Sequence, residues 1–185
     1  MMMSPRLRKL ALTLHVTSSV GWIGAVASSL VLSLAGLMSQ DAEVVRGAYL
    51  TLELIARFLL IPLSFASLLT GLTQSLGSKW GLFRHYWVIF KLLINLVATG
   101  ILLSYTQTFN HLAAIASNRS LSDAEILALR SSSPVLHASA AIVVLLVATV
   151  LSVYKPQGMT RYGQRKQNEK RNKRTQKHSA LAQSV

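Results

Sequence analysis

"LALTLHVTSSVGWIGAVASSLVLSLAGL", residues 10–37, is an apolar segment whose single ionisable side chain is His15. A helix that crosses a bilayer needs about 20 mostly apolar residues, so this segment is long enough to span a membrane. Three further segments meet the same criterion, although Lys91 interrupts one of them. The four predicted spans are residues 10–38, 58–76, 86–106 and 135–154. The sequence therefore predicts an all-α polytopic membrane protein with a bundle of four transmembrane helices.

The composition combines a hydrophobic chain with a strongly basic end. The 185 residues are 51% hydrophobic and carry a formal net charge of +13, and residues 155–177 hold nine of the 19 Lys and Arg. The stretch 162–177 has almost no apolar side chains, which predicts a disordered tail. Basic residues beside a membrane attract anionic lipid headgroups by about 1 kcal/mol each, so the tail is expected to bind them. Nucleic-acid binding is the weaker alternative, because no aromatic residues are interleaved with the cations.

Several classes of function are excluded by missing residues. The chain has no cysteine, which excludes disulfides, thiolate metal ligands and covalent haem attachment through a CxxCH motif. It also has no glycine-rich phosphate loop, no HExxH motif and no carboxylate pair within a predicted span. These absences argue against a nucleotide-driven pump and a zinc protease.

The distribution of Lys and Arg predicts the orientation, because basic residues near span ends stay on the cytoplasmic side. With a cytoplasmic N-terminus, residues 1–9, the turn 77–85 and the tail 155–185 are inside, and 39–57 and 107–134 are outer loops. The inner segments then carry fourteen Lys and Arg, and the outer segments carry four: Arg46, Arg57, Arg119 and Arg130. The pattern predicts a multi-pass membrane protein with both termini cytoplasmic.

Local signals refine these boundaries. Ser122 and Glu125 have the spacing of a capping box, which predicts a short amphipathic helix in the second outer loop. Pro134 suits the first turn of the fourth span. Glu53 and Arg57 are four residues apart and are expected to pair on one helix face.

Two features of the first two spans need separate interpretation. Residues 25–27, Ala-Val-Ala, resemble a signal-peptide cleavage site. The apolar segment continues for about ten residues past that site, a length that favours a retained helix over a cleaved leader. In the second span, Pro62 predicts a kink.

Four histidines lie in or beside the predicted spans. His15 and His85 are near the cytoplasmic ends of the first and third spans, and His111 and His137 are near the outer ends of the third and fourth. Imidazoles from facing helices can coordinate haem iron, so these residues are candidate metal ligands, with His15 and His85 as the leading pair. The structural alternative stays open. The other three can be interfacial residues at helix ends, and His15 can hydrogen-bond to a neighbouring helix.

Lys91 and Trp22 complete the candidate cofactor-binding set with His15 and His85. On a helix, His15 shares a face with Trp22, and the small residues beside them allow another helix to approach closely. Lys91 has two interpretations. Its stem can snorkel to the inner headgroups, or it is a buried cation that pairs with an acidic group such as a haem propionate.

Three stretches resemble an uncharacterised family of small bacterial four-helix integral membrane proteins: LHVTSSVGWIGA (14–25), LTGLTQSLGSKWGLFRHYWVIFKLL (69–93) and LSVYKPQGMTRYG (151–163). The resemblance implies four spans in the bacterial plasma (inner) membrane, and it implies no activity because none is established for that family. More distantly, the spacing of His15, Trp22 and Gly24 is similar to the first helix of CopD-type copper-resistance proteins and HemJ-type protoporphyrinogen oxidases. The HemJ-type resemblance implies that His15 is a haem ligand. The chain lacks the LPRLF stretch of that group and a methionine-histidine cluster for copper, so neither activity is carried over.

These observations rank three functions. The first is a b-type haem-binding redox or electron-transfer membrane protein, which as an enzyme would be a haem-dependent membrane oxidoreductase. The second is a cofactor-free accessory or scaffold protein that acts with another, unidentified membrane protein. The third is copper or small-solute transport, for which the polar residues available within the spans are Ser28, Ser29, Ser64, Ser67, Gln74 and Asn95.

Overall fold

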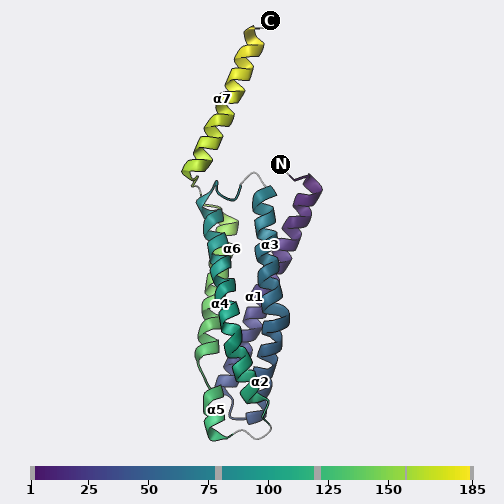
Figure 1. Cartoon of the computed structure of the whole chain (residues 1–185), viewed down its shortest axis with the longest axis vertical. Coiled ribbons are helices and arrows are strands. Elements are labelled where there is room, and N and C mark those ends of the chain that lie inside the picture. The colour runs from purple at the N-terminus through teal and green to yellow at the C-terminus, as the bar shows by residue number, and fades with distance from the viewer. Residues whose placement is uncertain (1–2, 78–80, 119–121, 157, 184–185) are drawn as a thin grey trace.

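The computed structural model describes residues 3–77, 81–118, 122–156 and 158–183, so Lys79 and Arg119, which contribute to the charge pattern, lie outside it. Within these residues the chain is helical and contains no strand. Four helical segments are long and apolar enough to cross a membrane, and they lie lengthwise against one another (Figure 1). They run over Pro5–Met38, Ala42–Gly77, Tyr86–Ala116 and Asp123–Tyr154. The predicted all-α architecture with four apolar helices is confirmed.

Helix α1 (Pro5–Met38) and helix α2 (Ala42–Ile55) are joined by a much shorter connection than the predicted outer loop 39–57. Only residues 39–41 lie between the two helices. The Asp41 carboxylate begins α2 by accepting a hydrogen bond of 2.9 Å from the backbone N–H of Glu43. Most of the predicted loop is therefore helix.

Helix α2 is amphipathic, which is why a search for uniformly apolar spans does not find it. Val45, Tyr49 and Leu52 recur at helical spacing and are buried, whereas the charged side chains of Glu43 and Arg46 form an ion pair of 3.6 Å on the helix. The Tyr49 hydroxyl donates a hydrogen bond to the carbonyl of Leu129. This contact ties α2 to the short helix α5 (Asp123–Leu129) at one end of the bundle.

A wider helical turn separates α2 from α3 (Ile61–Gly77). Residues Ala56–Leu60 form a π-helical segment, η1, immediately before Pro62. Because proline has no backbone N–H, it cannot continue the regular hydrogen-bond ladder, and the irregular turn lies where the sequence predicts a kink. The predicted pair between Glu53 and Arg57 is present at 3.2 Å on the surface beside this turn.

The second half of the bundle consists of α4 (Tyr86–Ala116) and α6 (Ser133–Tyr154), with α5 between them. Helix α4 extends ten residues past the predicted span, so the second outer loop is also shorter than expected. The capping box of Ser122 and Glu125 is present, as predicted. Helix α6 has proline in its first turn and ends at Lys155, whose backbone is left-handed with φ of 44°.

The apolar core is concentrated in the half of the bundle that contains α2 and α5. Aromatic and aliphatic side chains of α1, α2, α4 and α6 pack together there. The buried members are Trp22, Ala25, Val26, Val45, Tyr49, Leu52, Ala56, Leu60, Phe109, Leu112, Ala116, Leu129 and Leu145. The other half, toward the chain termini, has few buried side chains and contains the polar site described below.

The basic tail is helix α7 (Arg161–Gln183), where the composition predicts disorder. Lys, Arg, Gln and Glu favour helix, and Lys166 pairs with Glu169 at 3.2 Å. The helix leaves the bundle at the end that carries the N-terminus (Figure 1), and most of its described side chains are exposed. Its start is attached to the bundle. Thr160 donates from its backbone N–H to the carbonyl of Arg84 at 3.0 Å and from its hydroxyl to the carbonyl of Phe83 at 2.6 Å.

Candidate functional site

His15 points from α1 toward α3 and makes polar contacts with it. Its Nδ1 lies 3.1 Å from the carbonyl oxygen of Ser67 and 3.2 Å from the hydroxyl of Thr70. A carbonyl only accepts hydrogen bonds, so Nδ1 carries the hydrogen and Nε2 has the free lone pair. Gly71 makes this approach possible, because a Cβ there would lie 2.9 Å from Cε1 of the imidazole. His15 thus ties two helices together, as the structural alternative predicts.

A layer of hydroxyl and amide groups continues from His15 across the bundle. The Ser67 hydroxyl lies 2.9 Å from that of Ser19 on α1, and Asn95 of α4 donates to it at 3.3 Å. Thr99, one turn further along α4, lies 3.5 Å from the side-chain oxygen of Asn95. These groups link α1, α3 and α4, and two of them, Ser67 and Asn95, line a cavity that lies toward the chain termini.

Lys91 is half-buried and faces another helix of the bundle. Its ammonium group donates a hydrogen bond to the hydroxyl of Ser152 on α6. Ser152 is three residues from the C-cap of α6, so the ammonium group faces α6 near the end of the bundle that carries the chain termini. Both interpretations of Lys91, snorkelling to the inner headgroups and pairing with an acidic group, stay predictions. Lysine within a membrane segment is costly, and such residues usually face the bundle interior or a water-filled cavity.

The cationic cavity, as we name it, lies between α1, α3, α4 and α6 and has a volume of about 600 Å³. It extends along α4 from Trp87 to Asn95, a distance of about 12 Å at the rise of a helix. Among the described residues that line it there is no Asp or Glu. Its polar and charged lining consists of Arg8, His15, Ser67, Gln74, Ser75, Trp87, Lys91, Asn95, Ser152 and Lys155.

The mouth of the cationic cavity combines charge with exposed apolar side chains. Arg8 and Lys155 are exposed at its rim. Leu12 and Val16, which also line it, are exposed on the surface of α1. The mouth is therefore amphipathic, with cations for a charged group and an apolar side surface next to them.

The structure does not bring the other predicted ligands to this cavity. His85 is the N-cap residue of α4, and its backbone pairs with that of Met159. Its ring centre lies 6.5 Å from that of Trp87, and the residue is not among those that line the cavity. His111 is exposed near the end of α4. The described residues contain no group of three or more His, Asp or Glu side chains that could hold a metal ion. The predicted pairing of His15 with His85 around one site is thus not seen.

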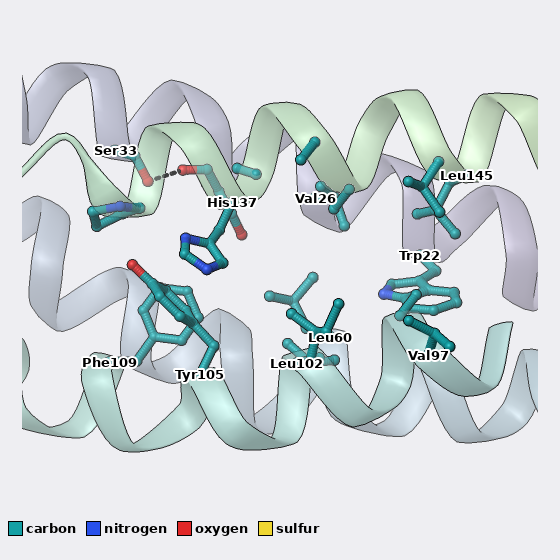
Figure 2. A pocket seen from close by; sticks show the side chains of 18 residues that line it. Trp22, Val26, Ser33, Leu60, Val97, Leu102, Tyr105, Phe109, His137 and Leu145 are labelled. Atoms are coloured by element: carbon teal, nitrogen blue, oxygen red, sulfur yellow. Dashed lines mark hydrogen bonds between the residues drawn. The ribbon is translucent and has the colours of Figure 1, made fainter. Parts of the chain in front are cut away.

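Trp22 and His137 line a second, apolar cavity of about 260 Å³ between α1, α4 and α6. Figure 2 shows Trp22 at one end of it and Tyr105, Phe109 and His137 gathered at the other. The His137 ring stacks on Tyr105 with ring centres 4.1 Å apart, and its Nδ1 lies 2.9 Å from the carbonyl of Ser133. Trp22 is fully buried and shares a cavity with His137, not with His15.

The part of α3 beside the cationic cavity has a sequence pattern that is typical of helix–helix contact more than of a ligand site. On α3, Ser64, Ser67 and Gly71 recur at three- and four-residue spacing. Small residues at this spacing let helices approach closely. This spacing of small residues on α3 could have predicted its contact with α1. Ser152 carries no comparable signal, because its role depends on facing Lys91 from another helix.

Comparison with protein-family models, curated proteins and solved structures gave no match. The protein is therefore described by its helical architecture and its two cavities. The helices define a multi-pass helical membrane protein, in which one half of the bundle is closely packed and the other contains a cation-lined cavity.

Proposed function

We propose that the protein binds an anionic amphiphile, with the charged group inside the cationic cavity and the apolar part beside α1. One observation carries this proposal: Lys91, Arg8 and Lys155 line one cavity without an acidic residue among its described lining. Lys91 is half-buried, and a cation that is partly removed from water is stabilised by negative charge beside it. Since the described lining contains no Asp or Glu, a bound anion would supply that charge.

The expected contribution of Lys91 is large enough to measure. A unit negative charge about 4 Å from an ammonium group is attracted by about 4 kcal/mol at an effective dielectric constant of about 20. Desolvation of the anion offsets a part of this attraction. Removing the lysine charge should therefore weaken binding of an anion at least tenfold, or by about 1.4 kcal/mol.

The proposal is tested by counting lipids that stay bound to the protein in native mass spectrometry. The probes are phosphatidylglycerol, which is anionic, and phosphatidylcholine, which is zwitterionic. The wild type should retain phosphatidylglycerol preferentially, Lys91→Gln should lose that preference, and Lys9→Gln should keep it. Lys9 is a matched control, because it is an exposed lysine of α1 that does not line the cavity. Equal retention of both lipids by the wild type would contradict the proposal.

Haem b is the second candidate, because it is an anionic amphiphile whose iron binds imidazole. Metal-bound histidines usually donate their other ring N–H to a carbonyl or carboxylate, and Nδ1 of His15 faces the Ser67 carbonyl in this manner. The donor set fits this group: His15 would hold the iron, and cations such as Lys91 and Arg8 would hold the two propionates. A bound haem would supply one-electron chemistry. Among the described lining residues His15 is the single histidine, so a bound haem would have one protein ligand from this set.

Absorption spectra of the purified protein distinguish haem from other anions. The protein is expressed with ample haem supply and measured oxidised and after dithionite reduction. His15→Ala should abolish a Soret band, whereas His111→Ala, which alters an exposed histidine, should not. A colourless wild type that also ignores added haemin would reject haem and leave lipid binding as the function to test.

We further propose that the protein lies in the bacterial plasma membrane with both termini cytoplasmic, as the positive-inside rule predicts. In this orientation α7 and the cationic cavity share the cytoplasmic end, where anionic headgroups are available. A peptide of residues 162–185 should bind liposomes that contain phosphatidylglycerol and not neutral liposomes. Equal binding to both would count against a role of the tail in lipid attraction.

A further inference from the structure

The apolar cavity of about 260 Å³ is a separate site from the cationic cavity and has a different chemistry. Its lining is almost entirely apolar, and it lies in the well-packed half of the bundle. Two serines in the lining, Ser29 and Ser33, donate to carbonyls of their own helix at 2.9 and 2.7 Å, so they are already satisfied. An apolar cavity of this size in a packed core is unusual.

The cavity is elongated along the helices. On α6 its lining runs from Pro134 to Leu145, which is about 16 Å at the rise of a helix. An apolar cavity of about 150 Å³ holds benzene, with six carbon atoms. By that comparison this cavity has room for roughly ten carbon atoms. Length and volume together match a stretch of one extended hydrocarbon chain.

Two polar side chains of the lining, Tyr105 and His137, lie at the end of the cavity on the side of α5, and the indole N–H of Trp22 lies at the other end. At the α5 end the Tyr105 hydroxyl lies 3.0 Å from the hydroxyl of Ser133, and Nδ1 of His137 lies 2.9 Å from the carbonyl of the same serine. Nδ1 thus carries the hydrogen, and Nε2 of His137 is left as an acceptor. Figure 2 shows the rings of Tyr105 and His137 against each other at this end. The cavity therefore has an apolar body and a polar end, as an amphiphile has.

The cavity has an opening on the surface that faces lipid. Val97 and Ile101 of α4 and Val144 of α6 line it and are also exposed on the outside of the bundle. These residues lie within the apolar helices, so their surroundings in a membrane are acyl chains. A lipid chain can enter between α4 and α6 without crossing water.

We propose that this cavity binds one alkyl chain of an amphiphile that carries a hydroxyl, carbonyl or carboxyl group. The chain lies between Trp22 and Tyr105, and the polar group lies beside Tyr105 and His137. A free fatty acid and an acyl chain of a phospholipid share this chemistry. The site needs no anion in the cationic cavity and is independent of the function proposed above.

Photolabelling of the full-length protein in lipid nanodiscs tests this site. One sample receives a diazirine-bearing fatty acid and a second receives phosphatidylcholine with the same diazirine chain, and labelled residues are mapped by mass spectrometry. Labels should concentrate on cavity-lining residues of α4 and α6 with at least one probe. The probe that labels them identifies the source of the chain.

Two neighbouring valines of α6 provide a matched pair of variants. Val144→Phe places a ring at the opening and should reduce labelling of the lining at least fivefold. Val143→Phe makes the same change at an exposed position that does not line the cavity, and labelling should be unchanged. Ala141→Phe, which fills the cavity itself, provides a second blocked variant if the first is poorly folded. Labels spread evenly over all lipid-facing helices, or equal labelling of the two valine variants, would overturn the proposal.

Discussion

The contact between His15 and α3 depends on the missing side chain of Gly71, and Gly71→Ala tests it. The new Cβ would lie 2.9 Å from Cε1 of His15, and ordinary contact begins at 3.4 Å, so the ring must move by about half an ångström. Its hydrogen bonds to Ser67 and Thr70 are already 3.1 and 3.2 Å long. We expect this movement to weaken or break both of them.

Two effects of opposite sign determine how Gly71→Ala changes the free energy of unfolding. Replacing glycine by alanine inside a helix gains about 0.5–1 kcal/mol of stability. Hydrogen bonds between membrane helices contribute about 0.6 kcal/mol on average and about 1.7 kcal/mol at most. Gly24→Ala is the control for the first effect, because nothing lies within 4 Å of its new Cβ. Gly71→Ala should thus be about 1 kcal/mol less stable than Gly24→Ala.

The assay is equilibrium unfolding in mixed micelles with a rising fraction of SDS, followed by helical circular dichroism. The same pair of glycine variants is then measured in a His15→Ala background, where no ring is displaced. There the two alanine variants should have equal stability. If Gly71→Ala is as stable as Gly24→Ala when His15 is present, the reasoning is wrong.

Two further predictions concern the ends of the bundle. Tyr49→Phe leaves the buried carbonyl of Leu129 without this donor and should lower the free energy of unfolding by about 1–2 kcal/mol; an unchanged SDS midpoint would show that the bond contributes little. Gly163→Ala puts a Cβ against the backbone carbonyl of Arg84 and should detach the start of α7. Hydrogen exchange at the Thr160 amide, which donates to that carbonyl at 3.0 Å, should then become faster, and an unaltered rate would argue against the clash.

Much of the fold could be predicted from local sequence. Uniformly apolar segments identify the four spans, and the pair of Ser122 with Glu125 predicts α5 because capping involves neighbouring residues only. Helix α2 could not be found in this way. Its buried residues, Val45, Tyr49 and Leu52, alternate along the sequence with charged residues. They are removed from solvent only by contact with other helices, which local sequence does not reveal. Span prediction therefore placed the second helix correctly and missed its first part.

The candidate site could be predicted only in part. His15 and Lys91 stand out because ionisable residues are rare in apolar spans, and both line the cationic cavity. Their partners could not be predicted, because the contact between Lys91 and Ser152 depends on which faces of α4 and α6 meet. His85 was expected beside His15 from its depth in the membrane alone. Depth does not determine which residues a helix-terminal side chain lies beside, and His85 is at the N-cap of α4, where its backbone pairs with Met159 and its side chain does not line the cavity.

The central claim is that an anion lies beside Lys91 in the cationic cavity. Solid-state NMR measures this directly, as dipolar coupling between the ¹⁵N of lysine side chains and the ³¹P of phosphatidylglycerol in membranes containing the labelled protein. We expect a strongly coupled component in the wild type that is lost in Lys91→Gln and kept in Lys9→Gln. Identical coupling in the wild type and in Lys91→Gln would contradict the claim that this cavity holds a lipid phosphate.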